Sequence, residues 1–567
     1  MHGFRAHWRM APLSESSVLL SKKLGLCRPI AQILANRGLH KIEEVELFLW
    51  GSWLDGPSPF LFKDMELCLE RIERALAKKE KIFIFGDYDA DGILALVMLY
   101  QTLSQLGAWV DYYVPDRLSE GYGIKGKHLE LIKGKGASLV ITVDCGIKAN
   151  EFVRLAKEAK IDVIITDHHQ PGGQTPEALA ILNPHLPDSG YPFPHLTAVG
   201  VAFKLIQALL IRKKRESLLP HYLKLVAIGT ITDMAPLIGE NRLLVRHGLR
   251  TISEVRNHGL KKLLESCGLH GDRITEGDVS FRLGPRINAA GRMASADLAV
   301  KLLLSESEEE ASHHSQKLTQ LNNVRQQVEE RILNQALTRI ITRHWSTKYK
   351  IIIAGCEEWS RGIIGIVANR LKEQFCRPVI LLAYENEYAY GSGRSIDSFS
   401  LIEALQSCYD LFEDFGGHHH AAGCVLRRER MAELKRRLNT FASSRLKDED
   451  LKPTLVFDCP LRFAEINRSL LQSYQLLPPF GPGNPRPIFL FSGVKVKSKA
   501  KLHINNLVKL KMEQDSHVFE VMGTFSPQEL ACFNEGTRLD VVASLHFVGP
   551  GEEDNFIFSV EDWAKPR

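Results

Sequence analysis

The chain divides into segments that differ in the spacing of their apolar and polar residues. Residues 1–80 carry apolar side chains at helical spacing, as in PIAQILANRGL and DMELCLERIERALAKKE. From Lys81 onward, short β-branched runs alternate with helical stretches; the runs are KIFIFGD, VDYYVPD, SLVITVDCG and DVIITDHH. Fully apolar strands separated by helices are typical of a parallel sheet covered on both faces. We therefore expect a helical segment at 1–80 and a parallel α/β domain at 81–305.

A second α/β unit is expected beyond a long helix. Within residues 306–345 apolar side chains recur at helical spacing, at Leu318, Leu321, Val328, Ile332, Ala336 and Ile340. We interpret this helix as a connector that packs on the core. The runs YKIIIAG and RPVILLAY then begin a smaller α/β domain at 346–445, in which RRERMAELKRR is typical of a solvated helix face.

The last part of the chain has the pattern of a small β-barrel. A charged linker, SSRLKDEDLKP, precedes residues 455–567, which combine strand-like runs with Gly/Pro turns. In GVKVKSKAKL the lysines alternate, at Lys495, Lys497, Lys499 and Lys501. On a regular strand this period puts all four on one face. Such a strip suits a single-strand nucleic-acid backbone, and lysines equally protect exposed edge strands; both interpretations stay open.

Composition narrows the class of protein. The chain has 567 residues, 44% of them hydrophobic and 25% charged, with a net charge of +5. This mild excess of positive charge permits an anionic partner without requiring one. The ten cysteines include no C-x-x-C pair, which fits a reducing compartment. The N-terminal residues lack the apolar core of a signal peptide, and no apolar run approaches the ~20 residues that span a bilayer. We predict a cytoplasmic protein with no membrane association.

The first apolar strand ends in three acids at alternate positions, Asp87, Asp89 and Asp91, within IFIFGDYDADGILAL. An EF-hand loop begins with the same D-x-D-x-D-G pattern but needs a bidentate Glu at its twelfth position, where this chain has Met98. The strand-like residues before the loop also contradict an EF-hand, which needs an entering helix. A solvated acidic turn remains the alternative for this stretch alone.

Acids and imidazoles recur where the predicted strands end. Asp144 closes LVITVD, Asp167–His169 close VIITDHH, and Asp233 follows the apolar GTIT. The carboxyl ends of parallel strands meet at one edge, so we expect these groups to converge. Clustered carboxylates need cations, and carboxylates with imidazoles suit Mn²⁺ or Mg²⁺. Two such ions about 3.5–4 Å apart would activate a water and hold a leaving oxygen. The residues therefore predict metal-assisted hydrolysis of a phosphate ester or anhydride.

The motifs resemble those of a known superfamily. DYDADG, VDCG, TDHH and GTITD resemble, in order, the four metal-site motifs of the DHH phosphoesterases. VPDRLSEGYGI, NPHLPDSGYPFPHLTAVGVAFKL, MAPLIGENR and LGPRINAAGRM are similar to segments of its bacterial single-strand-specific 5′→3′ DNA exonucleases. GSGRS and FGGHHHAAG resemble a DHHA1 domain, and PPFGPGNPRPIF resembles the start of an OB-fold. The resemblance implies a DHH domain at 81–305, a connecting helix at 306–345, a DHHA1 domain at 346–445 and an OB-fold at 455–567.

The resemblance also implies a set of metal ligands. These are Asp87, Asp89, Asp91, Asp144, His168 and Asp233. Within the first motif we rank Asp89 and Asp91 above Asp87. The implied catalytic set is Asp89, Asp91, Asp144, His168, His169 and Asp233. His169 would contact the scissile phosphate or support the ligands, and Asp167 would orient a histidine.

A pocket for the 5′ end of DNA is implied by the same resemblance. Its residues would be Arg117, Arg286, Asn288, Arg292, Ser392, Arg394 and His418. The loop containing GSGRS offers backbone amides, a hydroxyl and a guanidinium to a phosphate; taken alone it is also typical of a glycine-rich turn with a surface arginine. His419 and His420 fit ordinary packing or surface roles. The chain departs from the family at Ser360, where a histidine is usual in Trp-His-x-Gly.

The expected function is single-stranded-DNA-specific 5′→3′ exonuclease activity that releases mononucleotides in DNA repair and recombination. The strand would pass between the DHH and DHHA1 domains, with Mn²⁺ or Mg²⁺, two ions in all, as cofactor. A helicase and a single-strand-binding protein are the expected partners besides single-stranded DNA. One alternative is a phosphodiesterase of cyclic dinucleotides or short oligonucleotides, which usually lacks the OB-like tail. The other is a non-catalytic DNA-binding replication factor, in which metal ligands should be lost.

Overall fold

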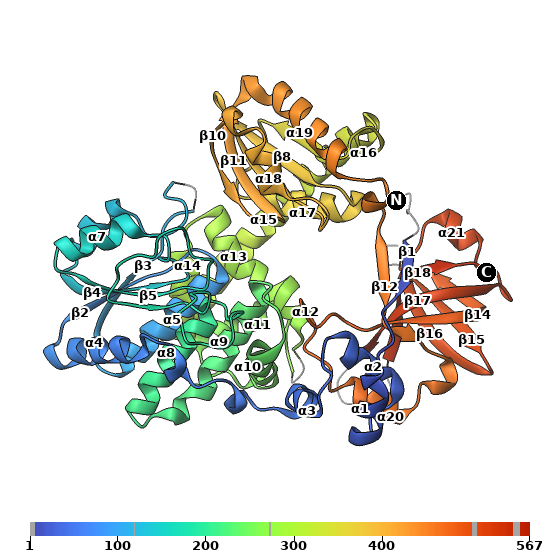
Figure 1. Cartoon of the computed structure of the whole chain (residues 1–567), viewed down its shortest axis with the longest axis horizontal. Helices are drawn as coiled ribbons and strands as arrows, with labels where there is room; N and C mark the ends of the chain where they lie inside the picture. Colours follow the sequence, from blue (N-terminus) through green and yellow to red (C-terminus); the bar gives the residue numbers. More distant parts are fainter. Residues whose placement is uncertain (1–5, 118, 272–273, 502–506, 548–555, 567) are drawn as a thin grey trace.

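The computed structural model describes residues 6–117, 119–271, 274–501, 507–547 and 556–566. Figure 1 shows three lobes: a large α/β lobe containing β2–β6, a smaller lobe containing β7–β11, and a barrel lobe containing β13–β18. We call them the first lobe, the second lobe and the barrel lobe. Within the described ranges no helix is long and apolar enough to cross a membrane; the cytoplasmic location stays a prediction.

A parallel sheet forms the centre of the first lobe, as predicted. Its strand order is β3-β2-β4-β5-β6 and every pairing is parallel. In β2, Ile82 and Ile84 enter the larger core while Phe83 and Phe85 enter the smaller core on the opposite face. This alternation confirms that both faces are covered. The strands are β2 (Lys81–Phe85), β3 (Trp109–Tyr113), β4 (Ala137–Val143), β5 (Asp162–Thr166) and β6 (Ala180–Leu182).

Helices cover both faces of this sheet and extend the lobe. They are α4 (Met65–Lys78), α5 (Ala90–Gln105), α6 (Leu129–Gly134), α7 (Asn150–Glu158), α8 (Ala198–Arg212), α9 (Leu219–Thr232), α10 (Gly239–Arg250), α11 (His258–Ser266), α12 (Glu276–Asp278), α13 (Gly284–Met293) and α14 (Asp297–Leu304). The π-helix η6 (Val279–Leu283) joins α12 to α13. The apolar helices α5, α8 and α9 make the largest contributions to the larger core.

The N-terminal segment departs from the prediction of a purely helical lead-in. Residues His7–Met10 form β1, which pairs in parallel with β12 (Thr454–Phe457). Helices α1 (Ser16–Leu24), α2 (Arg28–Asn36) and α3 (Ile42–Trp50) pack into the barrel core, whereas α4 packs on the first lobe. From His7 the chain therefore runs along the barrel lobe, and it crosses to the first lobe before β2. Local periodicity finds these helices but carries no information about the lobe that they cover.

Buried Arg242 of α10 secures the junction between the first lobe and the barrel lobe. Its guanidinium donates hydrogen bonds to the backbone oxygens of Phe48 (3.0 Å), Leu477 (2.8 Å) and Leu476 (2.8 Å). It also lies 3.6 Å from the centre of the Phe48 ring. One fully buried side chain thus joins α3, α10 and the segment that leads into the barrel.

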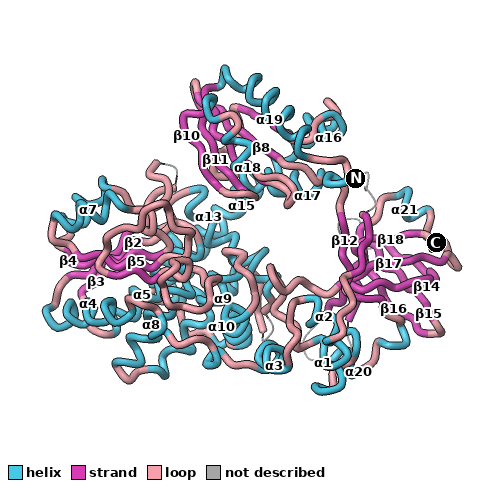
Figure 2. Tube along the Cα trace, in the orientation of Figure 1, coloured by secondary structure: helices cyan, strands magenta, loops and turns pink. Residues whose placement is uncertain are grey.

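The long helix α15 (Glu308–Thr342) connects the first two lobes, as Figure 2 shows. Leu318 belongs to the core of the first lobe, while Ile332, Ala336 and Ile340 belong to the core of the second. The prediction of a core-packing connector is confirmed.

The second lobe is built on a mixed sheet with the order β10-β11-β9-β8-β7, in which only β7 and β8 are parallel. Its elements are α16 (Trp345–Lys348), β7 (Ile352–Cys356), α17 (Ile364–Phe375), β8 (Val379–Glu385), β9 (Tyr388–Arg394), α18 (Leu401–Gln406), β10 (Phe412–Gly417), β11 (Ala421–Arg427) and α19 (Met431–Arg445). The prediction that GSGRS forms a loop is wrong for its first four residues, because Gly391–Arg394 belong to β9. A Cβ at Gly391 would lie 2.5 Å from Cys424 Sγ, so the glycine permits close packing rather than flexibility.

The barrel lobe closes through a pairing of β14 with β17, which confirms the predicted C-terminal β-barrel. Its elements are β13 (Cys459–Pro460), α20 (Arg468–Tyr474), β14 (Ile488–Lys501), β15 (Leu507–Gln514), β16 (His517–Thr524), α21 (Pro527–Ala531), β17 (Arg538–Phe547) and β18 (Phe556–Ala564).

The prediction that four lysines share one face of β14 is wrong. The register between β14 and β15 slips at Lys497, which has no partner in the ladder. After the slip Lys499 pairs with Leu510, whose side chain is fully buried. A one-residue bulge moves every later side chain to the other face. Lys499 and Lys501 therefore lie on the face opposite to Lys495, and no continuous strip forms.

Candidate metal centre and the adjoining pocket

The acidic loop after β2 is held at the start of α5. Asp89 is the N-cap residue: its Oδ1 accepts hydrogen bonds from the backbone N–H of Asp91 (3.0 Å) and Gly92 (3.1 Å). The amide oxygen of Asn288 accepts a hydrogen bond from the backbone N–H of Ala90 (2.8 Å). The loop is thus held by its own residue Asp89, which caps α5, and by Asn288 of α13. Its carboxylates lie at the carboxyl end of β2, where the sequence placed them.

Buried Asp91 joins two helix starts. Its Oδ2 accepts from the backbone N–H of Ala198 (2.6 Å) and its Oδ1 from Val199 (3.0 Å), both in the first turn of α8. Burial, followed by the nearby charge of Asp89, nevertheless raises the pKa of Asp91 to about 7. The two amides fix the direction of this carboxylate, and the clustered acids oppose its ionisation.

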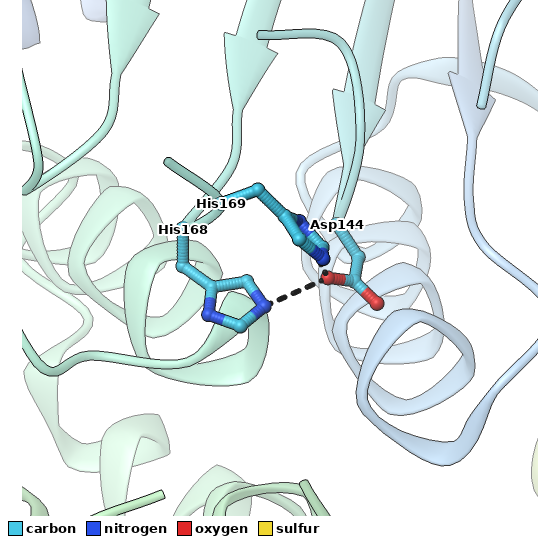
Figure 3. Close-up of side chains that lie close together, drawn as sticks. All are labelled: Asp144, His168 and His169. Carbon is cyan, nitrogen blue, oxygen red and sulfur yellow. Dashed lines mark ion pairs between the residues drawn. The ribbon is translucent and has the colours of Figure 1, made fainter. Parts of the chain in front are cut away.

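Asp144 follows β4 in a left-handed backbone conformation, with φ of 62°. Such a conformation costs of the order of 1 kcal/mol in a residue with a Cβ and is typical of functional sites. Its N–H donates to Thr166 of β5 (3.0 Å). Figure 3 shows the carboxylate facing the two histidines: Oδ1 lies 3.1 Å from His168 Nε2 and 3.8 Å from His169 Nδ1.

Fully buried Asp167 holds His169 in place. Its Oδ1 lies 2.8 Å from His169 Nδ1, and its Oδ2 accepts from the backbone N–H of Ile147 (2.9 Å). Burial alone would lower the pKa of His169. The hydrogen bond with Asp167 and the charges of Asp167, Asp89 and Asp91 together outweigh burial, and the pKa is raised. The Tyr122 hydroxyl lies 3.0 Å from the same His169 nitrogen and donates to the backbone oxygen of Asp144 (2.9 Å). Sequence reasoning did not single out Tyr122; its place in SEGYGI was the available signal.

Asp233 reaches the same region from a helix rather than from a strand. It caps the C-terminus of α9, and its N–H donates to Gly229 O (2.9 Å). Burial, followed by the charges of Asp91 and Asp89, raises the pKa of Asp233 to about 9. The next residue, Met234, has a left-handed backbone with φ of 59°.

The predicted ligands form three overlapping groups, and the donor atoms within each lie no more than 4.8 Å apart. The groups are Asp87, Asp89 and Asp144; Asp91, His168 and Asp233; and Asp144, His168 and His169. All six residues predicted as ligands are thereby brought together.

The donor set fits hard divalent cations. Asp87 Oδ1 and Asp144 Oδ1 are buried and accept no hydrogen bond from a described group. Burial first, and then the charge of Asp89, raises the pKa of both acids well above the ordinary value. Burial, with His169 next in effect, lowers the pKa of His168 to about 4, so its imidazole is neutral at pH 7 and has a lone pair to give. Carboxylate oxygens with a neutral imidazole are ligands for Mn²⁺ or Mg²⁺.

A pocket of about 460 Å³ lies between the first and second lobes. Arg117 and Gly121 line it from the first lobe; Arg361, Ser392 and other residues of β9–β11 line it from the second. The guanidinium of Arg361 lies 4.2 Å from the centre of the Tyr390 ring. The pocket is thus open to a ligand that touches both lobes.

Ser392 and Arg394 are joined within this pocket region. Arg394 Nη1 donates to Ser392 Oγ (3.3 Å). A Cβ at Gly365 would lie 2.8 Å from Ser392 Oγ and 3.2 Å from Arg394 Nη2, so the first turn of α17 packs directly on both side chains. Helix N-termini favour anions, which adds to the positive charge of the arginine.

Three arginines from different elements gather between the pocket and the acids. Arg292 of α13 donates to Gly362 O of the second lobe (3.0 Å). Burial, and next the charge of Arg117, lowers the pKa of Arg292 to about 10, and the same two causes lower the pKa of Arg394. Arg117 lies over the Tyr88 ring (5.0 Å) within the acidic loop. Clustered guanidiniums of this kind suit a phosphate group.

The other predicted substrate residues have different surroundings. Arg286 donates to the backbone oxygens of Arg282 (2.8 Å) and Ser266 (3.4 Å), so it is tied to α11. Asn288 supports the acidic loop, as described above. His418 lies in the turn between β10 and β11. Partial burial of its ring, followed by the charges of His420 and Arg394, lowers its pKa. At the position where the family has histidine, Ser360 accepts backbone hydrogen bonds from Ile363 and Ile364, before α17.

Comparison with known proteins gives a consistent result along the chain. Residues 81–230 match the model of the DHH family, N-terminal domain, residues 348–444 match the DHHA1 domain, and residues 457–548 match the RecJ OB domain. The chain is 38% identical to the single-stranded-DNA-specific exonuclease RecJ of Bacillus subtilis, over 93% of its own length and 66% of the relative's. It is 33% identical to RecJ of Escherichia coli, over 81% and 82% of the two chains.

The fold is also similar to solved structures of RecJ from Thermus thermophilus. The structure with Mn²⁺ has a TM-score of 0.85 at 29% identity, covering 99% of this chain and 80% of that one. The structure with Mg²⁺ has a TM-score of 0.75 at 27% identity and covers 79% of that chain. The chain spans about two thirds of the Bacillus subtilis relative and about four fifths of the Escherichia coli and Thermus thermophilus proteins.

Proposed function

The chain belongs to the RecJ family of single-stranded-DNA-specific exonucleases, and we propose that it hydrolyses single-stranded DNA from the 5′ end with release of mononucleotides. The observation that carries this proposal is the arrangement of two unlike sites side by side. A cluster of buried carboxylates lies next to three converging guanidiniums, those of Arg117, Arg292 and Arg394. The first suits metal ions and the second suits a terminal phosphate.

We assign the two ends of the acid cluster to two ions, Mn²⁺ or Mg²⁺. The group of Asp87, Asp89 and Asp144 would hold one, and Asp91, His168 and Asp233 the other. Bound ions supply Lewis acidity, which lowers the pKa of a water and offsets the charge on the scissile phosphate. The two buried acceptors without donors, Asp87 Oδ1 and Asp144 Oδ1, support this assignment.

The protein's own groups position the substrate. Arg394, joined to Ser392 and next to the first turn of α17, would hold the 5′ phosphate together with Arg117 and Arg292. His169 is oriented by Asp167 through Nδ1. In the protonated imidazole, which its raised pKa favours, Nε2 would donate to an oxygen of the scissile phosphate. These contacts address phosphates rather than base edges, so the reaction would not depend on sequence.

Strand selectivity would come from the site's place between two lobes. Arg292 bridges the lobes through Gly362, and the pocket is lined from both sides. A single strand can enter such a passage, whereas a duplex is wider. We further propose that a helicase supplies single strands, that a single-strand-binding protein hands them over, and that the activity serves DNA repair and recombination.

Digestion of single strands labelled at the 5′ or the 3′ end tests the proposal. With Mn²⁺, we expect the 5′ label to appear first as a mononucleotide, and a matched duplex to resist. Asp89→Ala should abolish release. If only dinucleotides are cleaved, the enzyme acts on small substrates; if neither substrate is cleaved while DNA still binds, the chain is a binding factor.

A further inference from the structure

One loop of the first lobe reaches both the arginine pocket and the acid cluster. It follows β3 and comprises residues 114–125, described except at position 118; we call it the β3 loop. Arg117, near its start, lines the pocket between the lobes. Further along, the Tyr122 hydroxyl donates to the backbone oxygen of Asp144 (2.9 Å) and lies 3.0 Å from His169 Nδ1. The position of this one loop therefore affects both parts of the proposed site.

Glu120 anchors the β3 loop to the carboxyl end of the parallel sheet. Its Oε1 accepts hydrogen bonds from the hydroxyl of Tyr113 (2.8 Å), the last residue of β3, and from the backbone N–H of Asp116 (3.2 Å). Its Oε2 lies 2.8 Å from Nε2 of buried His128. The His128 ring in turn lies 5.0 Å from the ring of Phe85, the last residue of β2. One carboxylate thus ties the loop to the ends of two neighbouring strands.

The hydrogen bonds around Glu120 require a carboxylate. His128 Nδ1 accepts from the backbone N–H of Lys125 (2.9 Å), so the proton of the neutral ring is on Nε2 and points toward Glu120. Each oxygen of Glu120 therefore faces at least one donor. An amide at this position would set its NH₂ group against either the Nε2–H of His128 or the N–H of Asp116, whichever way it turned. Glutamine has the same size but cannot accept all three bonds.

Two glycines set the direction of Tyr122. Gly121 and Gly123, on either side of it, both have left-handed backbones, with φ of 73° and 79°. Glycine adopts this conformation without the steric cost that a Cβ brings. The chain therefore turns directly after Glu120, and the Tyr122 ring lies 5.2 Å from the ring of His169. The anchor and the tyrosine are thus separated by a single residue.

We propose that Glu120 is a positioning residue that controls phosphate recognition and hydrolysis together, by holding Arg117 at the 5′ phosphate and Tyr122 at the metal centre; this rests on the function proposed above. Arg117 lies three residues before Glu120, and Tyr122 lies two residues after it. Both carboxylate oxygens are engaged in hydrogen bonds within the first lobe, so Glu120 acts through its neighbours and not on the substrate. Loss of the anchor should therefore weaken both contacts at once.

Glu120→Gln tests this assignment, with Glu80→Gln as the matched control. The Glu80 side chain is buried to a similar degree, 21% exposed against 17% for Glu120, and binds Arg71 (2.6 Å) and the Ser138 hydroxyl (3.0 Å). Glu80 precedes β2, so it lies at the opposite end of the sheet from the acids. Tyr113→Phe serves as a second, milder variant, because it removes one hydroxyl from the anchor and keeps the ring.

Equilibrium binding measures the role of Arg117 without catalysis. Fluorescence anisotropy of single strands labelled at the 3′ end compares 5′-phosphorylated with 5′-hydroxyl strands, on the full chain with Ca²⁺ in place of the catalytic ion. We expect the wild type to bind the phosphorylated strand about tenfold more tightly or better. Arg117→Ala and Glu120→Gln should each reduce this preference to about threefold or less, and Glu80→Gln should retain it.

Steady-state kinetics with Mn²⁺ measure the role of Tyr122. Tyr122→Phe should lower kcat about five- to tenfold in the wild type, as expected for the loss of one hydrogen bond. In the Glu120→Gln background it should lower kcat less than twofold, because the ring is already displaced. In the Glu80→Gln background the full loss should remain, since distant sites act additively. A purely structural role of Glu120 would give the same Tyr122→Phe loss in both backgrounds.

The outcomes separate this assignment from the function on which it rests. An undiminished phosphate preference in Glu120→Gln, or equal Tyr122→Phe losses in the two backgrounds, would overturn the assignment. Tyr113→Phe should change both readouts in the direction of Glu120→Gln, by a smaller factor. Should the wild type release no nucleotide, the proposed function fails, yet the binding comparison still decides on the anchor. Should it digest strands while Glu120→Gln and Glu80→Gln behave alike, the positioning role alone is refuted.

Discussion

Replacing Asn288 by alanine separates two roles that this residue could have. Resemblance suggests a contact with the substrate, whereas the structure has its amide oxygen 2.8 Å from the N–H of Ala90, in the acidic loop. Ala90 is completely buried, so water cannot replace the lost acceptor. An unpaired buried N–H costs about 1–3 kcal/mol. We expect Asn288→Ala to destabilise the start of α5 and, with it, the geometry of Asp89.

The expected consequence is weaker metal binding. Removing a group that holds metal ligands in their orientation typically lowers the affinity for the metal about 10–100-fold. Titration of Mn²⁺, with free Mn²⁺ followed by electron paramagnetic resonance, should therefore give an affinity at least tenfold below the wild type. Nuclease activity at limiting Mn²⁺ should fall by a similar factor and recover at high Mn²⁺, with KM for DNA within about twofold of the wild type.

Asn257→Ala is the matched control. Asn257 also caps a helix in the first lobe, accepting from Leu260 N and donating to Leu303 O, both at 2.8 Å. Its loss should lower stability comparably without changing Mn²⁺ affinity. A raised KM for DNA with unchanged Mn²⁺ affinity in Asn288→Ala would refute the reasoning, because it would make Asn288 a substrate contact.

Four further changes test other parts of the account. Arg394→Ala should remove the preference for a 5′-phosphorylated strand over a 5′-hydroxyl strand. We expect kcat/KM to fall about tenfold or more for the phosphorylated strand alone. An equal loss on both strands would argue against a phosphate contact. Arg242→Ala should lower the free energy of unfolding by ~3 kcal/mol in thermal or urea denaturation, because three backbone oxygens lose a buried donor; a change below 1 kcal/mol would contradict its joining role. Gly291→Ala would bring a Cβ to 2.5 Å from a backbone oxygen of the acidic loop and should reduce Mn²⁺ affinity, whereas Gly277→Ala, with 3.6 Å to its nearest neighbour, should not. Burial tends to raise the pKa of Asp167, but its hydrogen bonds and the charge of His169 together outweigh burial and lower the pKa. Its stabilising contribution is therefore complete above pH ~4 and is lost as pH falls through the lowered value. Asp167→Asn should flatten this acid limb of the stability curve measured with chelator present.

The acid cluster could be predicted because local pattern and topology agree there. Apolar strands that alternate with helices indicate a parallel sheet, and the residues after such strands must meet at one edge. Asp144 and His168 lie together for this reason. Asp233 joins them from the end of α9, so the convergence of strand ends does not account for its position.

The errors concern features set by contacts between distant parts of the chain. The lysines of β14 were assigned to one face because a regular strand was assumed, and a bulge is defined by the partner strand. The glycines of β9 suggested a loop, but Gly391 is required by Cys424 on the neighbouring strand. Likewise, the pairing of β1 with β12 joins residues more than 440 positions apart, which no local pattern reveals.

Mn²⁺ stoichiometry, measured together with nucleotide release, tests the central claim most directly. Asp144 belongs to two of the three donor groups, including one of the two assigned to ions. The account predicts two Mn²⁺ ions per wild-type chain and 5′ mononucleotides from single strands, and for Asp144→Asn at most one ion and no release. Two ions bound with unchanged release in Asp144→Asn would contradict it.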